Sequence, residues 1–175
     1  MPERPEIPEA KDSFEKMVAI SIATMAVVLS VVGNHGDHAK TEAIIKTTEA
    51  SNRWAYFQSK SIKEHLAQTE LSSLLVLSPQ IMDPAKSHAL LEKLPEQIKR
   101  YETEKEAIKA EAEALEKDAA KKLRITERSD AGTLLLQIAI VLSSVAILSK
   151  WKPSWFAGLL LGAAGAAMGL SAYLL

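Results

Sequence analysis

Residues 131–175 read AGTLLLQIAIVLSSVAILSKWKPSWFAGLLLGAAGAAMGLSAYLL, two uncharged apolar runs separated by a short basic segment. The runs cover residues 131–149 and 155–175, and each is about as long as a helix needs to be to cross a hydrocarbon core roughly 30 Å thick. A third apolar run, MVAISIATMAVVLSVV, occupies residues 17–32. The sequence therefore predicts an all-α membrane protein with three transmembrane helices, over residues 14–33, 131–149 and 155–175.

The extramembrane part is predicted to be residues 34–130, which carry 16 of the 21 Lys and Arg residues and 17 of the 22 acidic residues. Balanced, interspersed charge is typical of a solvated helical surface and argues against a nucleic-acid partner, which requires clustered positive charge. The chain has no cysteine, which excludes disulfides, thiolate nucleophiles and zinc-thiolate sites. No phosphate loop, nucleophile elbow or zinc-helix motif is present, so we expect no enzyme activity and no cofactor.

Residues 39–77 contain no proline or glycine and predict one helix of roughly 58 Å. Its apolar positions recur at intervals of eleven, which favours a nearly straight or slightly right-handed superhelix. One row is Ile44, Ala55, Leu66 and Leu77, and the next is Ala43, Trp54, His65 and Val76.

A turn over residues 78–83 follows, with Asp83 as the expected N-cap of a second helix over residues 84–128 that Pro95 restarts. The two helices are predicted to fold back as an antiparallel, coiled-coil-like hairpin whose differing periods leave apolar surface for other copies. Residues 1–13, rich in Pro and Glu, are predicted to be disordered. The heptad-like seam of the second helix is Leu91, Leu94, Ile98, Tyr101, Lys105, Ile108, Ala112, Leu115 and Ala119.

Small residues share one face in two of the predicted spans, where they permit close approach of helix backbones. These rows are expected to pack on one another, either within one chain or between chains. The last span carries Gly158, Gly162, Gly165 and Gly169, and the first carries Ala19, Ala23, Ala26 and Ser30.

Polar residues inside the second predicted span are Gln137, Ser143 and Ser144. An amide in hydrocarbon needs a hydrogen-bonding partner, so Gln137 is expected to face another helix or a water-filled path. Trp151 and Trp155, beside the short connection to the last span, are expected to be interfacial anchors.

His35, Asp37 and His38 are the one local cluster with metal-ligand character, since imidazole and carboxylate suit a divalent metal. No third well-defined ligand accompanies the two histidines, which favours polar residues at the membrane surface over a metal site. Gly33 and Gly36 nearby could kink or break the helix.

The aromatic residues Trp54, Tyr56 and Phe57 cover more than one helical face, so they could seal the hairpin or pack against a second subunit. Ile98, Tyr101, Ile108 and Leu115 are expected to share that packing. The run Ala50-Ser51-Asn52-Arg53-Trp54-Ala55-Tyr56-Phe57-Gln58-Ser59-Lys60-Ser61, between a first span and a C-terminal pair of spans, resembles the bacterial membrane family catalogued as domain of unknown function 4337. The resemblance implies this architecture and a bacterial source, and it transfers no catalytic residue. We expect the protein to lie in the bacterial inner membrane.

Our leading hypothesis is a homo-oligomeric structural or scaffold protein whose partners are the lipid bilayer and other copies of itself. An ion-conducting oligomer, with Gln137, Ser143 or Ser144 along the path, and an accessory subunit of a larger membrane complex are the alternatives. Lys11 and Lys16 precede the first span, and Lys150 and Lys152 lie between the last two spans. They favour a cytoplasmic position for these two segments and an external, periplasmic hairpin, although basic residues before the second span oppose this.

Overall fold

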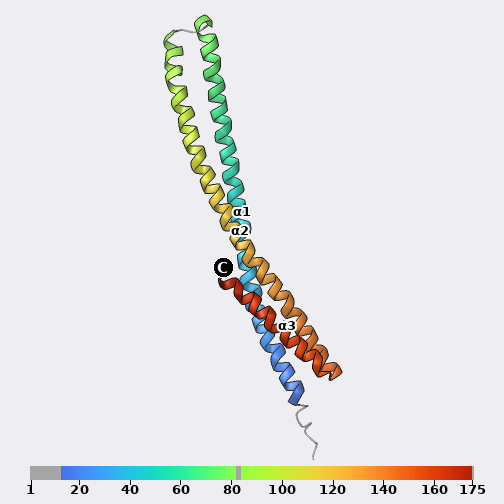
Figure 1. Cartoon of the computed structure of the whole chain (residues 1–175). Coiled ribbons are helices and arrows are strands. Elements are labelled where there is room, and N and C mark those ends of the chain that lie inside the picture. Colours follow the sequence, from blue (N-terminus) through green and yellow to red (C-terminus); the bar gives the residue numbers. More distant parts are fainter. Residues whose placement is uncertain (1–12, 82–83, 175) are drawn as a thin grey trace, which may run out of the picture. The chain divides into compact units, whose positions relative to one another are not determined.

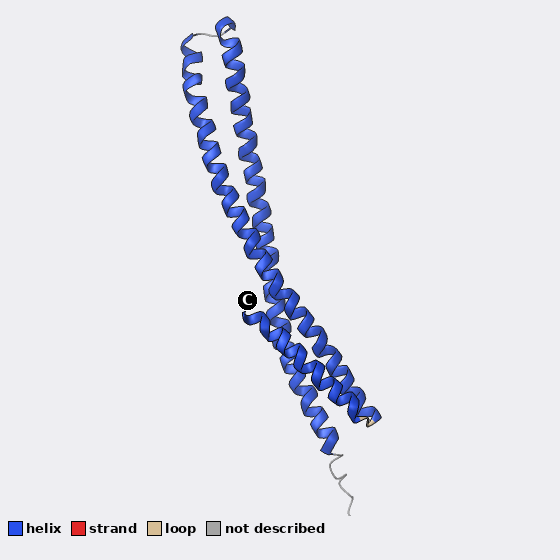
Figure 2. Ribbon diagram, viewed as in Figure 1, coloured by secondary structure: helices blue, strands red, loops and turns tan. Residues whose placement is uncertain are grey.

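A computed structural model of the chain describes residues 13–81 and 84–174. Within these ranges every residue except Lys150 and Trp151 lies in a helix, as Figure 2 shows. The predicted N-cap Asp83 and the N-terminal segment before Ser13 lie outside the described residues. The all-α class predicted from sequence is therefore confirmed for the described chain.

Helix α1 runs without interruption over Ser13–Ile81 (Figure 1). It passes through Gly33 and Gly36, both of which have negative φ angles, so the break that these glycines could have introduced does not occur. Gly36 is buried and closely approached by Ser129, whereas nothing approaches the Cβ position of Gly33. Close packing therefore explains a glycine at residue 36.

Helix α2 runs over Pro84–Ser149 and is also continuous, with Pro95 inside it. The expected restart at Pro95 is not observed. Proline lacks the N–H that would bond the carbonyl four residues earlier, so α2 continues through Pro95 with one backbone hydrogen bond fewer. Leu94, beside Pro95, is buried in a cluster with Ala67 and Leu74 of α1.

Helix α3 covers Lys152–Ser171 and continues as a 3-10 turn over Ala172–Leu174. The connection from α2 is only Lys150 and Trp151, and Lys150 has a positive φ of 54°, the left-handed conformation that often ends a helix. Pro153 lies in the first turn of α3, where a backbone N–H would have no acceptor within the helix, so its missing N–H costs no hydrogen bond. The tight connection that the sequence predicted is thus present.

The chain divides into two compact units, which are described separately. The first contains the described residues 13–42 and 121–174, where α3 lies beside α1 and α2 (Figure 1). Met25, Leu136 and Ala139 form its main core cluster, with Leu161 packed against it. A second cluster joins one residue from each segment: Ala39, Ile125 and Ala172.

The second unit, residues 43–120, consists of α1 and α2 side by side (Figure 1). Contacts pair early residues of α1 with late residues of α2: Arg53 with Glu111, Lys60 with Glu104, and Leu74 with Leu94. The predicted seam of α2, from Leu91 to Ala119, is buried or half-buried at all nine positions.

The contact face of α1 differs from the predicted one. Ala43, Ala50 and Glu64 are buried and recur at multiples of seven, whereas Ile44 and Leu66 of the eleven-residue row are about 60% exposed. Among the described side chains of α1 in this unit, this face consists mainly of alanines, with one leucine and one charged residue: Ala43, Ala50, Glu64, Ala67 and Leu74 are buried.

Each of the three helices contains a stretch that is long and apolar enough to cross a membrane.

Candidate functional site

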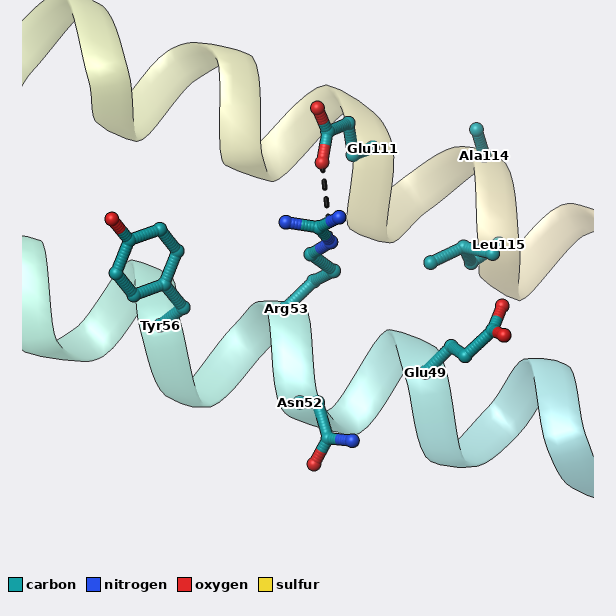
Figure 3. A pocket seen from close by; sticks show the side chains of 7 residues that line it. All are labelled: Glu49, Asn52, Arg53, Tyr56, Glu111, Ala114 and Leu115. Carbon is teal, nitrogen blue, oxygen red and sulfur yellow. Dashed lines mark ion pairs between the residues drawn. The ribbon is translucent and has the colours of Figure 1, made fainter.

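The aromatic and charged segment of α1 that begins at Asn52 lies against α2 and lines an open groove of about 660 Å³ (Figure 3). Arg53 reaches across the groove, and its Nε lies 3.2 Å from Oε2 of Glu111. Both side chains are about half exposed, so this ion pair contributes little to stability. The groove is lined by Glu49, Asn52, Arg53, Tyr56, Glu111, Ala114 and Leu115.

Trp54 and Phe57 form an edge-to-face pair with ring centroids 5.5 Å apart. The indole Nε1 of Trp54 donates a hydrogen bond to Glu116 of α2 at 2.8 Å. Phe57 is half-buried, and Nζ of Lys105 lies 5.8 Å from its ring centroid. These two aromatic side chains therefore contribute to packing within the chain, whereas Tyr56 is 46% exposed.

Lys60 links the two helices through an ion pair with Glu104. Its Nζ also lies 5.3 Å from the ring centroid of Tyr56 and 5.5 Å from that of Tyr101. The hydrogen bond from Lys60 lowers the pKa of Glu104 and, for the same reason, the pKa of Lys60 is raised. Arg100, 3.6 Å from Glu104, acts in the same direction on the carboxylate.

Glu64 occupies the buried face of α1 and is only 8% exposed. Its Oε2 accepts a 2.6 Å hydrogen bond from Nζ of Lys105, and its Oε1 accepts one from Gln68. The lysine that interrupts the apolar seam of α2 thus has a specific acceptor on α1. Sequence reasoning missed this pair, because neither residue's partner can be read from one helix alone.

On its other side, α1 carries a row of residues that are all exposed and all uncharged, which we call the uncharged stripe. Their spacings of three and four place them on one helical face over roughly 48 Å. The eleven-residue row Ile44, Ala55 and Leu66 belongs to this stripe. Its members are Ile44, Thr48, Ser51, Ala55, Gln58, Ile62, Leu66, Thr69, Ser73 and Val76.

All four glycines of the predicted row in α3 are buried within the first unit. A Cβ added to Gly165 would lie 2.9 Å from the carbonyl oxygen of Gly132, and one added to Gly169 would lie 2.5 Å from Val32 of α1. A Cβ at Gly158 would lie 2.9 Å from the carbonyl oxygen of Ala139 of α2, and one at Gly162 would lie 2.6 Å from Sδ of Met25 of α1. The glycine row is therefore used for packing inside one chain.

The small residues of the first span behave differently. Ala19, Ala23, Ala26 and Ser30 are all exposed, so the glycine row does not pack on them. Val18, Met25 and Val32, on the opposite side of α1, are the buried residues there.

Among the polar residues of the second predicted span, Ser143 is fully buried, whereas Gln137 and Ser144 are exposed. The Ser144 hydroxyl donates to the carbonyl of Val141. Close to Ser143, on α3, the indole Nε1 of Trp155 donates to Oγ of Ser21 at 3.1 Å, and the Trp155 ring packs edge-to-face with Phe14. Trp151 is 62% exposed.

His35 stacks on Tyr173, with ring centroids 3.8 Å apart, while Asp37 and His38 are exposed. The structure does not bring the three side chains into one site. Within the described residues, no three His, Cys, Asp or Glu side chains are grouped so that they could hold a metal ion.

Residues 14–175 match the family described as Domain of unknown function (DUF4337). The chain belongs to this family. The resemblance suggested by the segment that contains Trp54 is therefore confirmed, and it extends over both units. Comparisons with curated proteins and with solved structures gave no match.

Proposed function

We propose that this DUF4337 protein is a non-enzymatic, homo-oligomeric membrane protein with a structural role. Residues 43–120 would form an antiparallel hairpin outside the membrane, and the hairpins of several copies would pack together. The apolar parts of α1, α2 and α3 would span the bilayer of a cell membrane.

The uncharged stripe carries this proposal. A helix in water normally presents charged residues on the face opposite its partner. The stripe instead has ten exposed uncharged positions, and it includes Ile62, Leu66 and Val76 at 60–73% exposure. The α1–α2 contact uses the opposite side of α1, at Ala50, Glu64 and neighbouring residues. The stripe therefore takes no part in packing within one chain.

A second hairpin is the occupant that the stripe fits best. Long helices with apolar residues at three- and four-residue spacings pack side by side. A copy of the same chain supplies an uncharged face of equal length, and copies inserted in one membrane orientation carry this face on the same side of the membrane.

The test compares Leu66→Glu, in the middle of the stripe, with Gln97→Glu, which adds the same charge at an exposed position of α2. The full-length proteins are purified in mild detergent and their masses are measured by native mass spectrometry. We expect several copies for the wild type and for Gln97→Glu, and a shift to lower copy number for Leu66→Glu. An unchanged copy number in Leu66→Glu would show that the stripe is not the contact.

An ion-conducting oligomer is the second candidate, because the exposed Gln137 and Ser144 could face a path between copies. Ser143, buried inside one chain, could not. Flux through reconstituted liposomes that is lost in Gln137→Leu would favour this candidate over a purely structural role. Co-purification with other proteins at fixed stoichiometry would favour an accessory subunit.

A further inference from the structure

Gln137 lies on an exposed face of α2 within one of the most apolar parts of the chain. Leu134 and Val141, one turn away on either side, are 58% and 60% exposed. Within the part of the chain that the structure describes, the Gln137 amide makes no hydrogen bond. The residue is therefore a polar group whose surroundings are otherwise apolar and open.

An amide with this placement in a membrane needs a partner. Neither its N–H groups nor its carbonyl oxygen can bond to water in the hydrocarbon core, and leaving them unpaired costs several kcal/mol. Interhelical hydrogen bonds of such side chains are a recurrent cause of helix association in membranes.

The chain itself cannot supply the partner without losing its own packing. The opposite side of α2 is occupied by Leu136, Ala139 and Ser143, which are fully buried. A Cβ at Gly158 of α3 would lie 2.5 Å from Oγ of Ser143 and 2.9 Å from the carbonyl oxygen of Ala139. Turning α2 to bury Gln137 would separate these close contacts.

We infer that Gln137 meets Gln137 of a second copy, in a parallel α2–α2 contact around a symmetry axis. A carboxamide has both donors and an acceptor, so it is complementary to itself across such an axis. The contact face repeats at intervals of three and four and includes the small Ser144, which permits close approach. Its members are Leu134, Gln137, Val141, Ser144 and Leu148, all exposed in one chain.

This inference rests on the proposed homo-oligomer and names its contact inside the membrane. The absence of cysteine from the sequence makes it testable by disulfide cross-linking in native membranes. Single-cysteine variants Leu134→Cys and Val141→Cys report on the proposed face. Leu160→Cys on α3 and Val27→Cys on α1, both at least 65% exposed, serve as matched controls.

We expect covalent dimers from Leu134→Cys and Val141→Cys and few or none from the two controls. Adding Gln137→Leu to Val141→Cys should lower the dimer yield on the order of threefold, while Gln137→Asn should preserve it. Cross-linking that is equal at all four positions, or a yield unaffected by Gln137→Leu, would overturn the inference.

A further variant separates this inference from the proposed function. Leu66→Cys, on the uncharged stripe, should cross-link whether or not α2 is the membrane contact. Cross-links at Leu66→Cys without any on α2 would reject the Gln137 contact and leave the oligomer standing. Cross-links at neither place, with a single-copy mass, would reject both.

Discussion

Nζ of Lys105 lies 2.6 Å from Oε2 of Glu64, and the two side chains are only 17% and 10% exposed. The pair joins α1 to α2 in the middle of the second unit. Because neither charge can reach bulk water freely, each depends on the other, and the pair favours one alignment of the two helices.

Lys105→Met should destabilise this unit by about 3 kcal/mol, because it leaves Glu64 buried with only Gln68 as a partner. The double variant Glu64→Leu with Lys105→Met should recover most of the loss, since no charge is then left unpaired. Hydrogen exchange of residues 57–71 and 98–112 in the full-length protein measures the stability of the single and the double variant. Equal protection in Lys105→Met and the wild type would contradict the role given to the pair.

The Lys60–Glu104 pair predicts a loss of stability in acid. The pKa of Glu104 is lowered in the folded protein, so its contribution is complete above the ordinary glutamate pKa of about 4 and disappears as the pH falls through the lowered value. The pKa of Lys60 is raised, so its contribution is complete below about pH 10 and is lost as the pH rises through the raised value.

Glu104→Gln should therefore lower the melting temperature at neutral pH. The fall in melting temperature between pH 5 and pH 3 should also be smaller than in the wild type. Glu102→Gln, at an exposed neighbouring position, is the matched control and should leave the pH profile unchanged. Circular dichroism melts across this pH range provide the measurement. Identical profiles for Glu104→Gln and the wild type would exclude a contribution from this pair.

Two glycines that both lie inside helices should respond oppositely to alanine. A Cβ at Gly132 would lie 2.7 Å from the backbone nitrogen of Gly169, whereas a Cβ at Gly33 would meet no atom within 4 Å. Gly132→Ala should destabilise the first unit by about 1–3 kcal/mol, and Gly33→Ala should be neutral or stabilising by up to about 1 kcal/mol. Unfolding in increasing concentrations of SDS compares the stabilities of the two variants. A Gly132→Ala protein as stable as Gly33→Ala would refute the packing described for α3.

The proposed topology predicts that the hairpin and the α2–α3 connection lie on opposite sides of the membrane. Gln97→Cys should react with an impermeant maleimide from outside intact cells, and Trp151→Cys should react only after permeabilisation. Labelling of both from the same side would contradict the proposed number of spans. A reversed pattern would overturn only the orientation, which rests on Lys11, Lys16, Lys150 and Lys152.

The buried face of α2 and the glycine row of α3 could be predicted from the sequence alone. The three- and four-residue spacing from Leu91 to Ala119 marked the buried face of α2, and every position on it is buried or half-buried. The glycine row of α3 was also identified, because residues four and three apart share a face whatever their partner. The family assignment rested on the segment containing Trp54 and was confirmed over residues 14–175.

Other features depend on the partner helix and were not predictable from one sequence. The eleven-residue row of α1 contains apolar residues, but Ile44 and Leu66 point outward, since the inner face consists mainly of alanines with Leu74 and the paired Glu64. The choice between packing within a chain and between chains was open for both small-residue rows. The structure places the glycines inside and leaves Ala19, Ala23 and Ala26 exposed.

The most direct test of the proposed function is the mass of the full-length, wild-type protein in lipid nanodiscs and in mild detergent over a hundredfold range of concentration. One chain has a mass of 19.1 kDa. The proposed assembly through the uncharged stripe predicts one integer multiple of that mass in both environments. A single-copy mass throughout the range would contradict it.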